Sequence, residues 1–285
     1  MTINRRFIPP IAMHPILLFF LFLAFITGMF VEFLIIFLIV LIHECGHYFC
    51  AQYFRWRIRR IFLWIFGGVM ETDEYGTRPM KEEFLVTIAG PATHLFIFMI
   101  AWFIQQYDIL PEQTIMMIYQ YNTVILCGNL LPIWPLDGAR LIQLGCDLFL
   151  SHYRAHVVTI CTSFIVITAC LLIVYQIGAM SFSLLLLMIF LFWENRLEWK
   201  RRYYKWWRFL WSRHCQHHVP SRVKTIQVEP SMRLLDIFYH FRRHSRYVIS
   251  YHDPQVYQSY QLSEADCLDA FFEQKRYRES IREIA

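Results

Sequence analysis

Charged residues are scarce in this chain of 285 residues. Asp, Glu, Lys and Arg make up 17% of it, against about 25% in an ordinary soluble domain. Glycine and proline are also few, at 10 and 11 residues, which excludes collagen-like and Gly/Pro-rich low-complexity classes. The eight cysteines form no CxxC pair and no dense disulfide framework. Apolar residues are abundant instead, at 57% of the chain, and this composition indicates an integral membrane protein.

Long uncharged segments predict six transmembrane helices. The first segment covers Phe7 to Val31, and it is long enough to cross a hydrocarbon core, which takes about 20 helical residues. A signal peptide is the alternative interpretation of this segment, but no clear small-residue cleavage site follows it. The remaining predicted spans lie at 32–55, 84–105 and 114–134, with two short spans in 157–193 that turn at Gly178.

The distribution of basic residues predicts the orientation in the membrane. With the N-terminus inside, the outside loops lie near 29–32, 105–113 and 178–181, and they contain no Lys or Arg. All 27 Lys and Arg residues then fall on the other side. Because basic residues concentrate in cytoplasmic loops, we expect a multi-pass membrane protein with both termini in the cytosol.

Two parts of the chain are not predicted to span the membrane. Residues 56–80 are expected to form a membrane-surface β-hairpin or a re-entrant segment, unless they are only structural filler. Residues 196–219 form a basic aromatic helix suited to lipid headgroups; nucleic-acid binding is the rival interpretation, and we expect none directly. Residues 220–285 predict a small cytosolic α+β domain of order β-α-β-β-α, which leaves 1–195 as the six-helix domain.

The candidate chemistry begins with an HExxH motif, His43-Glu44-Cys45-Gly46-His47, inside the second apolar segment. Residues four apart share a helix face, so His43 and His47 can hold one metal ion. Glu44 is rotated by about 100° from His43 and can reach a water on that ion. Ionisable side chains within a span are expensive unless they have a function. A polar cluster that packs helices together is the alternative interpretation.

A tetrahedral catalytic zinc site needs a third protein ligand and leaves one position for water. Asp137 is the candidate, because it follows the prolines of Asn129-Leu-Leu-Pro-Ile-Trp-Pro-Leu-Asp137-Gly, which stop a regular helix near the inner face. Asn129 is the candidate substrate-positioning amide, with packing as its alternative role. His94 is interpreted as a histidine packed between helices, and the alternative is a residue that supports the metal ligands without binding the metal.

HECGH in a transmembrane segment, followed by NLLPIWPLDG, resembles the site-2 protease family of intramembrane zinc metalloproteases. The FGG at 66–68, the AGP at 89–91 and the cytosolic tail are similar to its sporulation branch. The resemblance implies that His43, His47 and Asp137 bind one Zn²⁺, with Glu44 as the general base and Asn129 contacting substrate. It also implies a sigma-factor precursor as the membrane-associated substrate, and inhibitory membrane proteins as partners.

The tail resembles a single CBS-type domain, which implies regulation by ATP. Residues 220–285 contain no glycine-rich phosphate loop, so the candidate nucleotide contacts are Arg242, Arg243, Arg246 and Tyr247. About 65 residues bury a core poorly, so we expect a homo-oligomer formed through the tail. A metal transporter that uses the same polar residues is the main rival function, although we detect no internal repeat between 1–100 and 101–200. An inactive nucleotide-sensing adaptor is the other rival.

Overall fold

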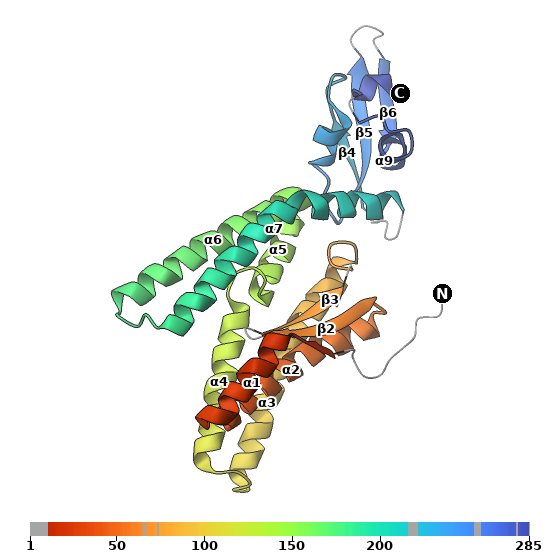
Figure 1. Ribbon diagram of the computed structural model, residues 1–285. Helices are drawn as coiled ribbons and strands as arrows, with labels where there is room; N and C mark the ends of the chain where they lie inside the picture. The colour runs from red at the N-terminus through yellow and green to blue at the C-terminus, as the bar shows by residue number, and fades with distance from the viewer. Residues whose placement is uncertain are drawn as a thin grey trace.

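The computed structural model describes residues 11–64, 67–72, 74–215, 222–253, 258–277 and 279–284. Most of these residues are helical (Figure 1). The long helices are α1 (Pro15–Thr27), α2 (Phe30–Tyr53), α3 (Met80–Gln106), α4 (Glu112–Leu130), α5 (Asp137–Phe149), α6 (His152–Gln176) and α7 (Phe182–His214). Figure 1 shows α1 to α4 grouped together, α6 beside α7, and the C-terminal tail at the opposite end from the α3–α4 turn.

Three of these helices are long and apolar enough to cross a membrane, namely α2, α3 and α6. The limits of the first predicted span are corrected by the structure, because Ile11–Met13 forms a strand and the apolar helix α1 covers only Pro15–Thr27. At 1.5 Å per residue, α1 is about 20 Å long, so a crossing of the hydrocarbon core would also need the residues on either side of the helix. The turn expected at Gly178 is present, and its φ of 68° is a left-handed conformation that glycine adopts readily.

The segment after α2 forms the hairpin that the sequence predicts. Strand β2 (Ile58–Trp64) pairs with β3 (Gly67–Thr72) antiparallel, and β1 (Ile11–Met13) adds to β2 in parallel. The strand order is β1-β2-β3, so β3 lies at one edge of the sheet. Ile61 and Leu63 are buried in a cluster that also contains Tyr48 of α2. This packing fixes the sheet against the helix that carries the HExxH motif.

The tail has the predicted β-α-β-β-α order. Its elements are β4 (Val223–Gln227), α8 (Leu234–Phe238), β5 (Arg246–Asp253), β6 (Gln258–Ser263), α9 (Glu264–Phe272) and the 3₁₀ turn Ile281–Glu283. Strand β5 is central, parallel to β4 and antiparallel to β6. The predicted boundary at 196 lies inside the continuous helix α7, whose Trp206, Phe209 and Leu210 are buried in the core of the tail. The tail core therefore includes the end of α7.

A buried ion-pair network, here called the Arg243 clasp, joins the tail to the helical domain. Its members are Arg243, Glu83 of α3 and Asp147 of α5. The Arg243 guanidinium donates to the two Glu83 oxygens at 2.7 and 3.0 Å and to Asp147 Oδ2 at 3.3 Å. Asp147 also faces His152 Nδ1 at 3.0 Å. The three clasp residues and His152 of α6 are all buried, so the clasp and this neighbour tie α3, α5 and α6 to one residue of the tail.

The electrostatics of the clasp favour its charged form. Burial alone would lower the pKa of Arg243, but the charges of Glu83 and Asp147 outweigh it and raise that pKa above its usual value. Burial would likewise raise the pKa of Asp147, yet His152 and Arg243 hold it below its usual range. The network therefore stays ionised, and removing its cation leaves two carboxylates buried together.

Replacing the clasp cation tests how firmly the tail is held. In Arg243→Met, we expect a loss of about 3 to 5 kcal/mol, the usual effect of breaking a buried ion pair. Thermal unfolding and limited proteolysis of the full-length protein in detergent measure this loss, with earlier cleavage between the tail and the helical domain. Arg233→Met is the matched control, since Arg233 is exposed on the same domain. Equal stability of the two variants would contradict a structural role for the clasp.

Candidate metal centre

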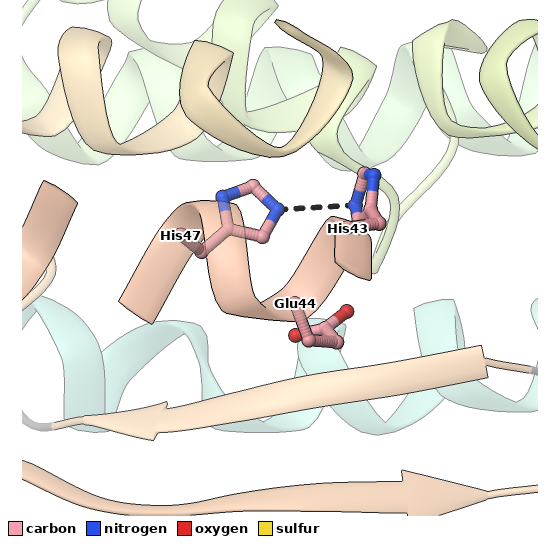
Figure 2. A group of neighbouring side chains, drawn as sticks. All are labelled: His43, Glu44 and His47. Carbon is pink, nitrogen blue, oxygen red and sulfur yellow. Dashed lines mark hydrogen bonds between the residues drawn. The ribbon is translucent and has the colours of Figure 1, made fainter. Parts of the chain in front are cut away.

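Three ligand atoms meet between α2 and the start of α5. His43 Nε2 and His47 Nε2 lie 3.1 Å apart (Figure 2). Asp137 Oδ2 lies 3.2 Å from each of them. The three residues are only 3%, 4% and 8% exposed. The sequence predicted this trio, and the structure brings all three together.

The secondary structure explains how each residue reaches this point. His43 and His47 stand one turn apart on α2, so their rings share one face. Asp137 is the first residue of α5, directly after the non-helical segment 131–136. Ser163 of α6 accepts from the Trp134 amide at 3.0 Å, and Asn195 of α7 donates to the Trp134 carbonyl at 2.7 Å. Helices α6 and α7 thus hold the segment that aims Asp137 at the histidines.

Hydrogen bonds to the imidazole rings of His43 and His47 define which nitrogen of each ring can bind a metal ion. Asn122 donates through Nδ2 to the His94 carbonyl at 3.0 Å, so its Oδ1 accepts from His94 Nδ1 at 2.7 Å. His94 Nε2 then accepts from His43 Nδ1 at 3.0 Å. His47 Nδ1 donates to the Val86 carbonyl at 2.7 Å. In both ligand candidates the proton sits on Nδ1, which leaves the Nε2 lone pair directed at Asp137.

This arrangement fits a zinc ion. Tetrahedral ligands about 2.0 to 2.1 Å from zinc lie about 3.3 Å from one another, close to the observed separations of 3.1 and 3.2 Å. Asp137 Oδ2 is buried and has no hydrogen-bond partner among the described residues. Two imidazole nitrogens and one carboxylate oxygen are also a ligand set of catalytic zinc sites.

Glu44 lies on a different side of α2 from the two histidines. Figure 2 shows its side chain directed at a neighbouring strand. The strand is β3, whose Gly68 lies directly beside the Glu44 side chain. A Cβ atom at Gly68 would lie 2.3 Å from Glu44 Cγ, so only glycine lets the strand pass this close. The backbone of β3 therefore fixes the position of Glu44 beside the histidine pair.

Helix α3 approaches the two imidazoles through a glycine. A Cβ atom at Gly90 would lie 2.2 Å from His47 Nε2 and 2.8 Å from His43 Cε1. Since neither ring can move without losing its hydrogen bond to Val86 or His94, a larger residue at Gly90 does not fit. The segment AGP at 89–91 thus has a steric reason to contain glycine.

The other predicted site residues lie elsewhere. Asn129 is half-buried near the end of α4 and donates to the Ile125 carbonyl at 3.1 Å. Arg243 is part of the clasp, and Tyr247 is buried and stacked on Phe241. These two placements correct the nucleotide-facing role expected for them, because their polar and aromatic groups are already engaged. Arg242 and Arg246 are half-buried in the tail.

Sequence reasoning missed part of the site. Asn122 was not predicted, although it is fully buried and orients His94. His94 is both a packed histidine and the residue that supports His43. The available signal was a polar residue at each of these positions within apolar helices, but their pairing depends on how α3 and α4 pack.

Comparison with known proteins identifies the fold and the chemistry together. The family model described as peptidase family M50 matches residues 31–111. Stage IV sporulation protein FB of Bacillus subtilis is 35% identical over 96% of this chain and 95% of its own length. The chain belongs to peptidase family M50, the site-2 proteases. A site-2 protease of Methanocaldococcus jannaschii shares the fold, with a TM-score of 0.53 and 21% identity over 66% of this chain and 89% of its own.

A second relative agrees with the metal chemistry of the M50 peptidase. A zinc metalloprotease of Methanocaldococcus jannaschii is 29% identical over 47% of this chain and 42% of its own length. Together with the apolar spans, these matches make the chain a membrane metalloprotease. This result excludes the metal-transporter interpretation of the buried polar residues.

The close approach of α3 gives a direct test of the metal centre. In Gly90→Ala, the added methyl group would overlap both imidazoles, so we expect most bound zinc to be lost from the M50 peptidase. Elemental mass spectrometry of purified, detergent-solubilised protein measures the zinc per chain. Gly128→Ala on α4 is the matched control, because a Cβ atom there meets nothing within 4 Å. Full zinc content in Gly90→Ala would show that the imidazoles are not where the metal binds.

Proposed function

We propose that this peptidase cleaves a membrane-associated protein at one Zn²⁺ held by His43, His47 and Asp137. The observation that carries the proposal is the convergence of three buried ligand atoms within 3.2 Å of one another. When bound, zinc would acidify a water molecule and polarise the substrate carbonyl. The adjacent Glu44 carboxylate would accept the proton of that water and pass it to the leaving amine.

The edge of the sheet offers a way to present the substrate. A helical peptide has its carbonyls hydrogen-bonded, so it must be extended before hydrolysis. Strand β3 pairs with β2 alone among the described strands, and it passes directly beside Glu44. An extended substrate segment that adds to β3 by backbone hydrogen bonds would lie next to the metal centre. Asn129 keeps one amide hydrogen and its carbonyl oxygen for contacts to that segment.

The proposed architecture follows the distribution of charge along the chain. Residues 1–195 would cross the membrane six times with both termini in the cytosol, since the turns after α1, α3 and α6 contain no Lys or Arg. Residues 196–219 would lie at the headgroups, and 220–285 would form a CBS-like domain. That domain would pair with another copy, and an ATP site there would use Arg242 and Arg246.

The biological substrate proposed is a sigma-factor precursor of a spore-forming bacterium. Support comes from the Bacillus relative, whose name, stage IV sporulation protein FB, places that protein in sporulation. Its similarity extends through the tail, since 96% of this chain is covered. Inhibitory membrane proteins are the partners proposed for such a regulated enzyme.

Replacing the candidate base tests the chemistry. Glu44→Gln preserves the side-chain shape and removes the proton acceptor, so cleavage should fall by about 10² to 10⁴-fold while zinc stays bound. Co-expression with a membrane-tethered sigma-factor precursor, followed by immunoblotting, measures cleavage. Glu112→Gln is a control at the first residue of α4. Unchanged cleavage by Glu44→Gln would rule out this hydrolytic mechanism.

Removing the third ligand tests the metal assignment separately from activity. Asp137→Ala should lose most of its zinc, because two histidines alone leave a tetrahedral site incomplete. Zinc per chain in the purified protein is the readout. Asp236→Ala in the tail is exposed and should keep full zinc. If Asp137→Ala also keeps full zinc, the third ligand must be another residue, and His94 is the next candidate.

A further inference from the structure

A cavity of about 150 Å³ lies between the helical domain and the end of α7. Its walls come from the turn after β3, the first turns of α3 and α6, helix α5 and the segment 202–209 of α7. Arg243 of the tail also contributes to the wall. The cavity is separate from the ligand trio, because neither His43, His47 nor Asp137 lines it.

The side chains around this cavity are strongly basic. Among the described residues of its lining, Glu83 is the one carboxylate, and it is neutralised by the Arg243 clasp. The cationic lining residues are Arg140, Arg202, Lys205, Arg208 and Arg243. Lys205 has an ion pair with Glu198. Within the described part of the chain, neither Arg140 nor Arg202 forms an ion pair, and these two uncompensated charges call for an anion.

Arg140 is the clearest case of a cation without an acid. Its guanidinium lies 3.7 Å from the centre of the Tyr75 ring and 5.1 Å from that of Trp134. In the described part of the chain it forms no ion pair. Two flat rings hold the group in place while leaving its five N–H donors available for an anion.

Two buried polar residues add further unused hydrogen-bonding capacity. Thr87 and His156 line the cavity and are 1% and 4% exposed. Thr87 Oγ1 and His156 Nδ1 have no hydrogen-bond partner among the described residues. Buried polar atoms of this kind are normally satisfied. With cationic donors around them, they suit a ligand that supplies several oxygen acceptors.

The crowding of cations is also visible in Lys205. Burial lowers the pKa of Lys205 to about 8, although Glu198 opposes the shift. The nearby charges of Arg140 and Arg208 lower this pKa further. An anion in the cavity would offset the repulsion among these three cations.

The donors around the cavity favour a phosphate over a carboxylate. The cavity volume of about 150 Å³ is far above the roughly 10 to 15 Å³ that one water molecule needs, so a phosphate group fits. A phosphate also offers four oxygens to donors that converge from several helices, whereas a carboxylate offers two.

The position of the cavity points to a membrane source for that phosphate. Helices α3 and α6 both start at its wall, so it lies at the end of two apolar spans. Tyr75, Trp134, Tyr153 and Trp206 also line it, and aromatic residues beside basic ones are typical of the headgroup zone. Basic pockets between transmembrane helices are known to bind anionic headgroups. We propose that this cavity binds the phosphate of an anionic phospholipid, with Arg140 and Thr87 as direct contacts.

The test measures lipid binding by the full-length protein, independently of peptidase activity. The protein is purified in detergent and placed in phosphatidylcholine nanodiscs that contain increasing amounts of phosphatidylglycerol. Native mass spectrometry then counts the phosphatidylglycerol molecules retained. We expect one tightly held molecule per chain, and at least about tenfold weaker retention in Arg140→Gln. Thr87→Val, which replaces the hydroxyl by a methyl group of similar size, should also weaken retention.

Matched variants separate the cavity from general surface charge. Arg154→Gln removes an exposed charge of α6 near the same membrane face and should retain lipid as the native protein does. Arg140→Lys keeps a positive charge and should recover part of the binding. This recovery distinguishes the loss of a charge from a loss of the fold. Equal lipid retention in Arg140→Gln and Arg154→Gln would overturn the proposal. So would an effect of Arg140→Gln only on the KM of a substrate with an acidic residue near its cleavage site.

Competition with inorganic phosphate distinguishes a phospholipid from a soluble phosphate as the ligand of the cavity. In the lipid assignment, millimolar phosphate should neither stabilise the delipidated protein against heat nor displace phosphatidylglycerol. Stabilisation by phosphate that disappears in Arg140→Gln, without retained lipid, would overturn the lipid source and assign the cavity to a soluble phosphate.

Discussion

The meeting of two histidines and one aspartate inside a helical bundle is the constraint on which the rest of the structure depends. Polar groups at this depth are costly unless each one has a partner. The Nδ1 atoms of the two imidazoles are hydrogen-bonded to the Val86 carbonyl and to His94, which is itself held by Asn122. The backbone of α3 at Gly90 packs against the same two rings. Much of the arrangement of α2, α3 and α4 can therefore be understood as support for two imidazole rings.

The third side chain places a different demand on the fold. Asp137 can reach the histidines only because α4 ends at Leu130 and a new helix begins at Asp137. The prolines of the intervening segment lack amide donors, which reduces the number of backbone groups that need partners there. Ser163 and Asn195 satisfy backbone groups of Trp134, so α6 and α7 are needed to form the metal centre although neither supplies a ligand.

The sequence was sufficient for features that depend on local spacing. HExxH defines one helix face, and the proline-rich segment before Asp137 marks a break, so both could be predicted. The features it could not define depend on packing between distant segments. His43 and His94 are 51 residues apart, and Arg243 and Glu83 are 160 apart. Arg243 was expected to face a nucleotide because the tail has no glycine-rich phosphate loop and basic side chains would have to meet the phosphates. Its two acid partners become visible only once α3 and α5 are placed. Strand β1 lies within an uncharged segment, and it could not be predicted there because its pairing partner β2 is distant in the sequence.

Helix α5, which the sequence did not reveal as an element, connects the three polar centres of the molecule. Asp137 at its first residue faces the histidines, Arg140 lies in the basic cavity, and Asp147 belongs to the Arg243 clasp. A helix of 13 residues is about 20 Å long with a fixed rise per residue, so the positions of these three side chains along it depend on one another. Docking of the tail at Asp147 and the placement of Asp137 beside the imidazoles therefore constrain the same helix.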